Sequence, residues 1–248
     1  MKRDEKLKLG ITSYSLRKFS RPDAIAMTGR LGLKYIALKD FHLPLEAAAA
    51  EIEASAEKVA QAGIKLMGCG VVYMPADEAY VRQVFEYAKT GGMPVIVASP
   101  DLDALDICNR MVGEYDIKIA IHNHGPGDNK YPLPSDAYNL VKDMDRRMGV
   151  CPDIGHTVRL GADAVEEIER VSDRMHDLHI KDVDAAVEEG KTCEVGRGVV
   201  DIAKILTTLL GLNYDGHVAL EYEKDPDDPL AGMAESIGYI RGVLSVIM

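Results

Sequence analysis

Short apolar runs rich in β-branched residues recur along the chain at fairly even intervals. Such runs are typical of buried strands. They predict strands at residues 7–14, 35–40, 64–73, 94–99, 117–124, 148–153, 175–182 and 217–223. Stretches with helical periodicity lie between them. The clearest is PLEAAAAEIEASAEKVAQAG at residues 44–63, which is rich in Ala and Glu and is closed by Gly63.

The order of these elements predicts the fold. Eight strand–helix units in 248 residues give about 31 residues per unit, a comfortable length for a βα repeat. We therefore expect a single (β/α)8 TIM barrel, an α/β domain that occupies residues 1–248. A doubly wound sheet would need a glycine-rich phosphate turn after its first strand, but residues 7–19 contain no GxGxxG motif.

Side-chain alternation predicts which residues point into the barrel. In the strand at residues 117–124, Ile117, Ile119 and Ile121 share one parity, and bulky aliphatic residues normally face the outer helices. His122 and His124 have the opposite parity. We therefore expect both histidines to point inward.

The same alternation in the next three strands turns further polar residues inward: Asp153, His179, Lys181, Glu221 and Glu223. All of them lie at the C-terminal ends of their strands. Barrel enzymes build their active sites on that face.

Four adjacent strands thus bring His122, Asp153, His179 and Glu221 to one place. Two imidazoles and two carboxylates suit one divalent ion such as Mn, Zn, Co or Fe, and suit Mg less well. His124 would face whatever the metal holds. Taken singly, each residue has another interpretation: a hydrogen-bonded rim histidine, a cap of the next segment for Asp153, or half of an ion pair for Glu221.

The composition narrows the class of protein. With 47% hydrophobic and 28% charged residues the chain is typical of a folded globular protein, and its net charge of −11 without basic clusters disfavours nucleic acid as a partner. Four widely separated cysteines indicate a reduced compartment. No apolar run approaches the ~20 residues of a membrane span. We therefore expect a cytoplasmic protein that binds no membrane.

Several strand ends resemble those of a known family. CPDIGH (151–156), HIKD (179–182), VGRGVVD (195–201) and ALEYE (219–223) resemble the xylose isomerase-like TIM barrel family of sugar phosphate isomerases and epimerases. That family also includes ketose 3-epimerases, hydroxypyruvate isomerase, inosose dehydratase and the endonuclease IV type of nuclease. The resemblance implies a divalent metal held by His122, Asp153, His179 and Glu221. It also implies that His156 and Arg197 contact the substrate.

One position departs from the family pattern. Ketose epimerases of the family carry Glu where this chain has His122, so the formal charge of a four-ligand divalent site rises from −1 to zero. Epimerisation is divided there between two metal-bound glutamates. With Glu221 as the remaining base, we expect aldose–ketose isomerisation or elimination to be easier than two-base epimerisation.

Other polar residues fit a pocket for a polyol. Lys39 and His42 follow the second strand, and Lys181 and Glu223 lie two residues beyond His179 and Glu221. Each could instead be a solvated rim residue or part of a salt bridge. Arg159 could belong to either group.

The expected function is a metal-dependent isomerase or epimerase of a sugar, sugar phosphate or keto sugar, with Glu221 and His156 as catalytic residues. A lyase, dehydratase or hydrolase acting on keto sugars or keto-inositols remains an alternative, as does a sugar-binding barrel without activity. The chain's acidity disfavours the nuclease branch. The expected partner is a small sugar, and a homo-oligomer is possible.

Overall fold

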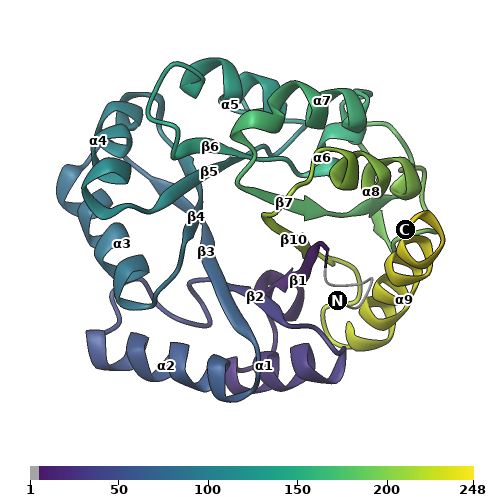
Figure 1. Cartoon of the computed structure of the whole chain (residues 1–248), viewed down its shortest axis with the longest axis horizontal. Helices are drawn as coiled ribbons and strands as arrows, with labels where there is room; N and C mark the ends of the chain where they lie inside the picture. Colours follow the sequence, from purple (N-terminus) through teal and green to yellow (C-terminus); the bar gives the residue numbers. More distant parts are fainter. Residues whose placement is uncertain (1–5) are drawn as a thin grey trace.

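A computed structural model describes residues 6–248 and shows a barrel of parallel strands surrounded by helices (Figure 1). The barrel strands are β1 (Lys8–Thr12), β2 (Tyr35–Leu38), β3 (Lys65–Met74), β4 (Val95–Pro100), β5 (Lys118–His122), β6 (Met148–Cys151), β7 (Asp177–Ile180) and β10 (His217–Leu220). Each overlaps one of the predicted runs, so the predicted barrel is confirmed.

The strands are hydrogen-bonded in the order β6-β5-β4-β3-β2-β1-β10-β7. The barrel closes between β6 and β7 through two bridges, Val150 with Met175 and Asp153 with His179. Strands β5, β6, β7 and β10 are therefore neighbours, and their C-terminal ends meet on one side of the barrel mouth. A short antiparallel ribbon of β8 (Asp182–Val183) and β9 (Thr192–Cys193) follows β7.

The helices form the outer ring (Figure 1). They are α1 (Arg21–Arg30), α2 (Ala49–Gln61), α3 (Glu78–Thr90), α4 (Leu105–Tyr115), α5 (Pro134–Val141), α6 (Ile154–Arg159), α7 (Ala164–Val171), α8 (Ile202–Gly211) and α9 (Leu230–Ile247). Several begin at capping side chains. Ser20 accepts a hydrogen bond from the backbone of α1, and Asp77 does the same for α3.

The hydrophobic core has two parts that follow the predicted side-chain parity. The larger part lies between the strands and the helices and contains Ile119 and Ile121. A small second cluster contains Val97, Ala120 and Cys151, which have the opposite parity and fill the barrel interior. The inward direction of His122, two residues after Ala120, follows from this arrangement.

Helix α9 has the length and composition of a helix that could cross a membrane, because its 18 residues have a mean hydropathy of 1.3. One face of it packs on the barrel: Met233, Ile237, Ile240 and Leu244 belong to the larger core cluster. We therefore interpret α9 as the last helix of the ring, next to α8 (Figure 1).

Candidate active site

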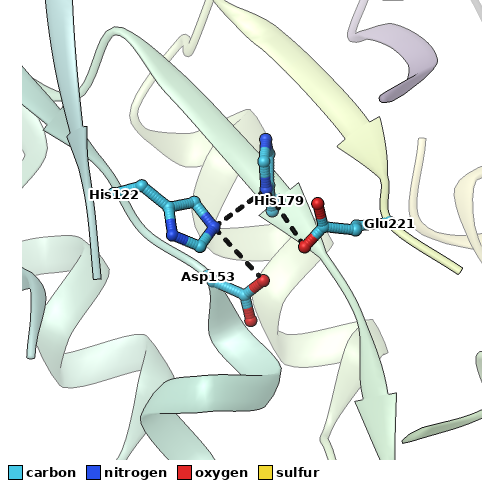
Figure 2. A group of neighbouring side chains, drawn as sticks. All are labelled: His122, Asp153, His179 and Glu221. Carbon is cyan, nitrogen blue, oxygen red and sulfur yellow. Dashed lines mark hydrogen bonds and ion pairs between the residues drawn. The ribbon is translucent and has the colours of Figure 1, made fainter. Parts of the chain in front are cut away.

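The structure brings the four predicted metal ligands together at the barrel mouth (Figure 2). His122 ends β5, Asp153 follows β6, His179 lies in β7 and Glu221 follows β10. One nitrogen or oxygen atom of each lies within 4.8 Å of those of the other three.

The imidazoles of His122 and His179 make the central contact of this group. Nε2 of His122 lies 3.0 Å from Nδ1 of His179 and 3.6 Å from Oδ2 of Asp153. Nδ1 of His179 lies 3.5 Å from Oε2 of Glu221. All four residues are buried. Two nitrogen and two oxygen donors therefore converge on a small, buried volume.

Asp153 has two roles that the sequence presented as alternatives. Its Oδ1 accepts a hydrogen bond from the backbone N–H of His156 at 2.8 Å and caps α6, while Oδ2 points to the imidazole of His122. The side chain of Asn123 fixes this turn, because its Oδ1 accepts the backbone N–H of Asp153 at 2.8 Å. Sequence reasoning missed Asn123 because its parity turns it away from the barrel interior.

Lys181 lies among the carboxylates of the site. Its Nζ is 2.9 Å from Oδ2 of Asp153, 2.9 Å from Oε2 of Glu221 and 2.7 Å from Oε1 of Glu223. The aliphatic stem of Lys181 passes over Gly155, where a Cβ atom would lie 2.8 Å from two of its carbon atoms. A glycine at position 155 is thus what lets this ammonium reach the centre.

The Lys181 ammonium and the neighbouring histidines decide the charge state of the carboxylates. Burial is the largest influence and would raise the pKa of Asp153 and of Glu221, but Lys181 and the histidines together outweigh it and hold both pKa values well below their usual ranges. Both groups are therefore ionised at neutral pH. Ionised carboxylates are the form that binds a divalent ion.

The histidines of the site differ in charge. Burial lowers the pKa of His122 to about 4 and that of His156 to about 3, so both are neutral at pH 7. Burial also opposes protonation of His179, but Cys151 and Glu221 outweigh it and place the pKa of His179 well above its usual value. His122 could therefore act as a metal ligand without losing a proton, whereas His179 would have to release one to bind a metal ion.

A cavity of about 250 Å³ opens above these residues. Of the predicted pocket residues, Lys39, His124, His156 and Glu223 line it, together with His122 and Glu221. Tyr14 and Tyr73 also line it. Sequence reasoning did not single out these two tyrosines, because Tyr14 follows β1 and Tyr73 lies near the end of β3 without a motif of its own.

His124 has a fixed orientation on the wall of the cavity. Its Nδ1 lies 3.1 Å from Oδ2 of Asp128, and its ring stacks on Tyr73 with centroids 5.9 Å apart. Nε2 lies 3.4 Å from the hydroxyl of Tyr73.

Two predicted substrate contacts lie elsewhere in this structure. Both ring nitrogens of His42 are engaged, with Oγ of Ser13 at 2.9 Å and the carbonyl of Phe19 at 3.0 Å. Arg197 pairs with Glu235 on α9. Neither side chain lines the cavity in this structure.

Arg159, left open by the sequence, is held at the rim. Its Nε donates to the carbonyl of Glu188 at 3.0 Å, and its guanidinium lies 3.5 Å from Nδ1 of His156.

The residues present fit a divalent ion. Imidazole nitrogen and carboxylate oxygen are the donors preferred by Mn, Zn, Co and Fe. Oδ2 of Asp153 is buried and accepts no hydrogen bond of good geometry from the described residues. A buried ionised oxygen without such a bond is costly unless a cation faces it, and a divalent ion would meet that need better than Lys181 alone.

A sequence model of the xylose isomerase-like TIM barrel matches residues 25–243. The chain belongs to this family. Curated relatives include an inosose dehydratase from Geobacillus kaustophilus, 32% identical over 89 residues that cover 30% of this chain and 29% of the relative. An inosose dehydratase from Lacticaseibacillus casei is 27% identical over 128 residues, 46% of this chain and 43% of the relative. The matched parts thus span less than half of these two relatives.

Two solved structures resemble nearly the whole chain. The 3-keto-D-glucoside 4-epimerase of E. coli superposes with a TM-score of 0.77 at 14% identity, over 95% of this chain and 99% of that one. The probable 3-DHS dehydratase of Bacillus anthracis gives a TM-score of 0.75 at 13% identity, over 95% and 99% of the two chains. At these identities the likeness shows the fold alone.

Proposed function

We propose that this protein is a divalent-metal-dependent isomerase or epimerase of keto sugars that removes a proton from the carbon next to a carbonyl. The observation that carries this proposal is the convergence of His122, Asp153, His179 and Glu221 within 4.8 Å beneath a polar cavity. A passive rim would not need four buried donors on four different strands.

The four side chains would hold the ion. A bound divalent ion would polarise the substrate carbonyl and stabilise the negative charge that develops on its oxygen. Membership of the family supports this proposal.

Glu221 is the proposed base. Its carboxylate lines the cavity, and the Lys181 ammonium 2.9 Å away keeps it ionised at neutral pH. His156 also lines the cavity, 3.4 Å from Nζ of Lys181 through its Nε2. As a neutral imidazole with a lowered pKa, His156 can hydrogen-bond a substrate hydroxyl without adding charge.

Dehydration is the second candidate. Two observations favour it: the position of His122, where a second carboxylate would serve epimerisation, and the inosose dehydratases among the relatives. The first step would be the same removal of a proton by Glu221. The carbanion would then expel the hydroxyl of the neighbouring carbon, which leaves as water with the proton that Glu221 took up in the first step, so that Glu221 is ionised again.

The test is the exchange of carbon-bound hydrogen in deuterated water. Metal-loaded protein is incubated with a panel of keto sugars and keto-inositols, and products are followed by NMR and mass spectrometry. A product that carries carbon-bound deuterium and has otherwise the same elemental composition as the substrate indicates isomerisation or epimerisation. A product that is lighter than the substrate by one water indicates dehydration. Glu221→Gln should abolish exchange, whereas Glu53→Gln on the exposed face of α2 should not. Binding without any exchange would overturn the proposal in favour of a passive sugar-binding barrel.

Metal dependence is tested by elemental analysis of protein purified without added metal and after reconstitution. We expect about one Mn, Zn, Co or Fe per chain, lost in Asp153→Ala. Asp163→Ala is a matched control, because Asp163 caps α7 as Asp153 caps α6 but lies on the surface. Absence of metal from both the wild type and the control would overturn the proposal.

A further inference from the structure

The ionised groups that line the cavity are mostly negative. Glu221 and Glu223 are carboxylates of the wall, and Lys39 is the one lysine among the lining residues within 6–248. Arginine is absent from the lining of this part of the chain. Phosphates and carboxylates are normally bound by free cations, above all by arginine. The lining therefore offers few positive groups that could bind an anionic substrate.

Both lysines near the cavity are already engaged. Lys39 donates a hydrogen bond to the carbonyl of Val71 and lies 3.6 Å from Oδ1 of Asp40. Lys181 is shared by three carboxylates at 2.7–2.9 Å. If Lys181 turned to a phosphate, two buried carboxylates would lose their partner, which is strongly unfavourable.

The guanidinium of Arg17 is also engaged behind the wall. It lies 4.8 Å from the ring centroid of Tyr14 and donates to the carbonyls of Tyr14 at 3.3 Å and Glu223 at 2.7 Å. These contacts fix the wall of the cavity, and Arg17 is not part of its lining.

A divalent ion would complete the charge balance of the site. Lys181 contacts three carboxylates, Asp153, Glu221 and Glu223, so these four groups carry a net charge of −2, which a doubly charged cation would bring to zero. A phosphate dianion would leave two negative charges uncompensated in a partly enclosed space, where like charges repel most strongly. An uncharged substrate leaves the balance intact.

The walls also offer flat aromatic faces. Tyr73 is 61% exposed and presents its ring beside His124, and Tyr14 lines the cavity as well. Such side chains combine an apolar face with a polar tip, which suits a ring compound that has C–H faces and hydroxyl edges.

We infer that the cavity selects uncharged polyhydroxy ketones and rejects sugar phosphates and keto acids. This inference rests on the proposed function for the identity of the reacting group. Proton removal next to a carbonyl would be possible in neutral keto sugars, sugar phosphates and keto acids alike, and the lining of the cavity favours the neutral class.

The experiment compares matched ligands by NMR titration on the Zn²⁺-loaded protein. D-fructose is paired with D-fructose 6-phosphate, whose charge lies far from the carbonyl. A neutral keto-inositol is paired with 3-dehydroshikimate, a cyclic keto acid. We expect the neutral member of each pair to bind about tenfold more tightly or better, because one uncompensated charge near Glu223 costs at least that factor. Equal or tighter binding of the anionic members, or binding of neither, would overturn the inference.

Two variants test the physical cause. Glu223→Gln removes one negative charge and should lower the ratio of the Kd of the anionic ligand to that of its neutral partner by several-fold. Tyr73→Lys adds a cation at the exposed rim and should do the same, which keeps the test valid if Glu223→Gln folds poorly. An unchanged preference in Tyr73→Lys would overturn the inference. Deuterium exchange, measured in parallel, separates the two proposals: a neutral-ligand preference without exchange supports the binding inference and contradicts the catalytic proposal.

Discussion

The ammonium of Lys181 lies 2.9 Å from Oδ2 of Asp153, and neither side chain is exposed by more than 1%. This pair stands where the four candidate metal ligands converge, because Lys181 touches Glu221 at the same distance. In this structure a lysine thus supplies the positive charge that the buried carboxylates require.

Replacing Lys181 tests this arrangement. Lys181→Met should lower the free energy of unfolding of the metal-free protein by about 3–5 kcal/mol, since buried carboxylates lose their counter-charge. Saturating Zn²⁺ or Mn²⁺ should recover much of this loss, so the gain in stability on metal binding should exceed that of the wild type. Urea unfolding with chelator and with metal measures both. Lys191→Met, on the exposed hairpin, should show neither effect. A loss that metal leaves unchanged would contradict the electrostatic explanation.

Acid should destabilise the metal-free protein through its buried histidines. The folded-state pKa is about 4 for His122 and about 3 for His156, against about 6.5 in the unfolded chain. As pH falls below about 6.5, the two histidines are protonated in the unfolded chain before they are protonated in the folded protein. The free energy of unfolding should therefore fall by about 1.4 kcal/mol per pH unit for each histidine as pH drops from about 6.5 towards 4.

The carboxylates Asp153 and Glu221, whose pKa values are depressed, should add to this loss below about pH 4.5. His179, with its raised pKa, has the opposite dependence, but its stabilisation is lost only above about pH 6.5. Urea unfolding between about pH 6.5 and pH 5, where His179 contributes no slope, measures the dependence due to His122 and His156. In His122→Gln the slope of the free energy of unfolding against pH should correspond to about one proton fewer than in the wild type. An unchanged slope would show that His122 titrates normally.

Gly155 should resist substitution because of Lys181. In Gly155→Ala the new methyl group would lie 2.8 Å from the lysine stem, so we expect a loss of about 1–3 kcal/mol and weaker metal binding as the ammonium shifts. Gly29→Ala in α1 is the matched control, because its Cβ would meet no atom within 4 Å and should stabilise slightly. Equal effects of the two substitutions on metal affinity would contradict the proposed packing role.

Position 122 should decide between one-base and two-base chemistry. We expect the wild type to exchange deuterium into a ketose faster than it forms the 3-epimer. His122→Glu adds a second carboxylate beside His179 and should raise the ratio of epimer formation to exchange by about tenfold or more. His122→Gln, which removes the imidazole without adding charge, is the control. Rapid interconversion of 3-epimers by the wild type would show that one carboxylate suffices.

The sequence alone determined the barrel and the direction of its polar strand ends. Eight runs of strand length, separated by helical segments, allow few folds other than a closed barrel. The alternation of Ile119, Ile121 and the residues between them fixed the parity of His122, because side chains on a strand alternate strictly between its two faces. Parallel strands in one barrel then had to bring His122, Asp153, His179 and Glu221 to the same end.

Only the tertiary structure decided which polar groups meet and which charge each carries. Lys181 was predicted as a pocket residue, yet its contact with three carboxylates depends on the space above Gly155, in the first turn of α6. Arg197 and His42 are side chains that could contact a substrate, but in the structure they make other contacts. Arg197 pairs with Glu235, and the ring nitrogens of His42 lie within hydrogen-bond distance of Ser13 and Phe19. Periodicity along a strand is local and can be read from the chain, whereas the partner of a long polar side chain is set by loops and rotamers that only the folded molecule fixes.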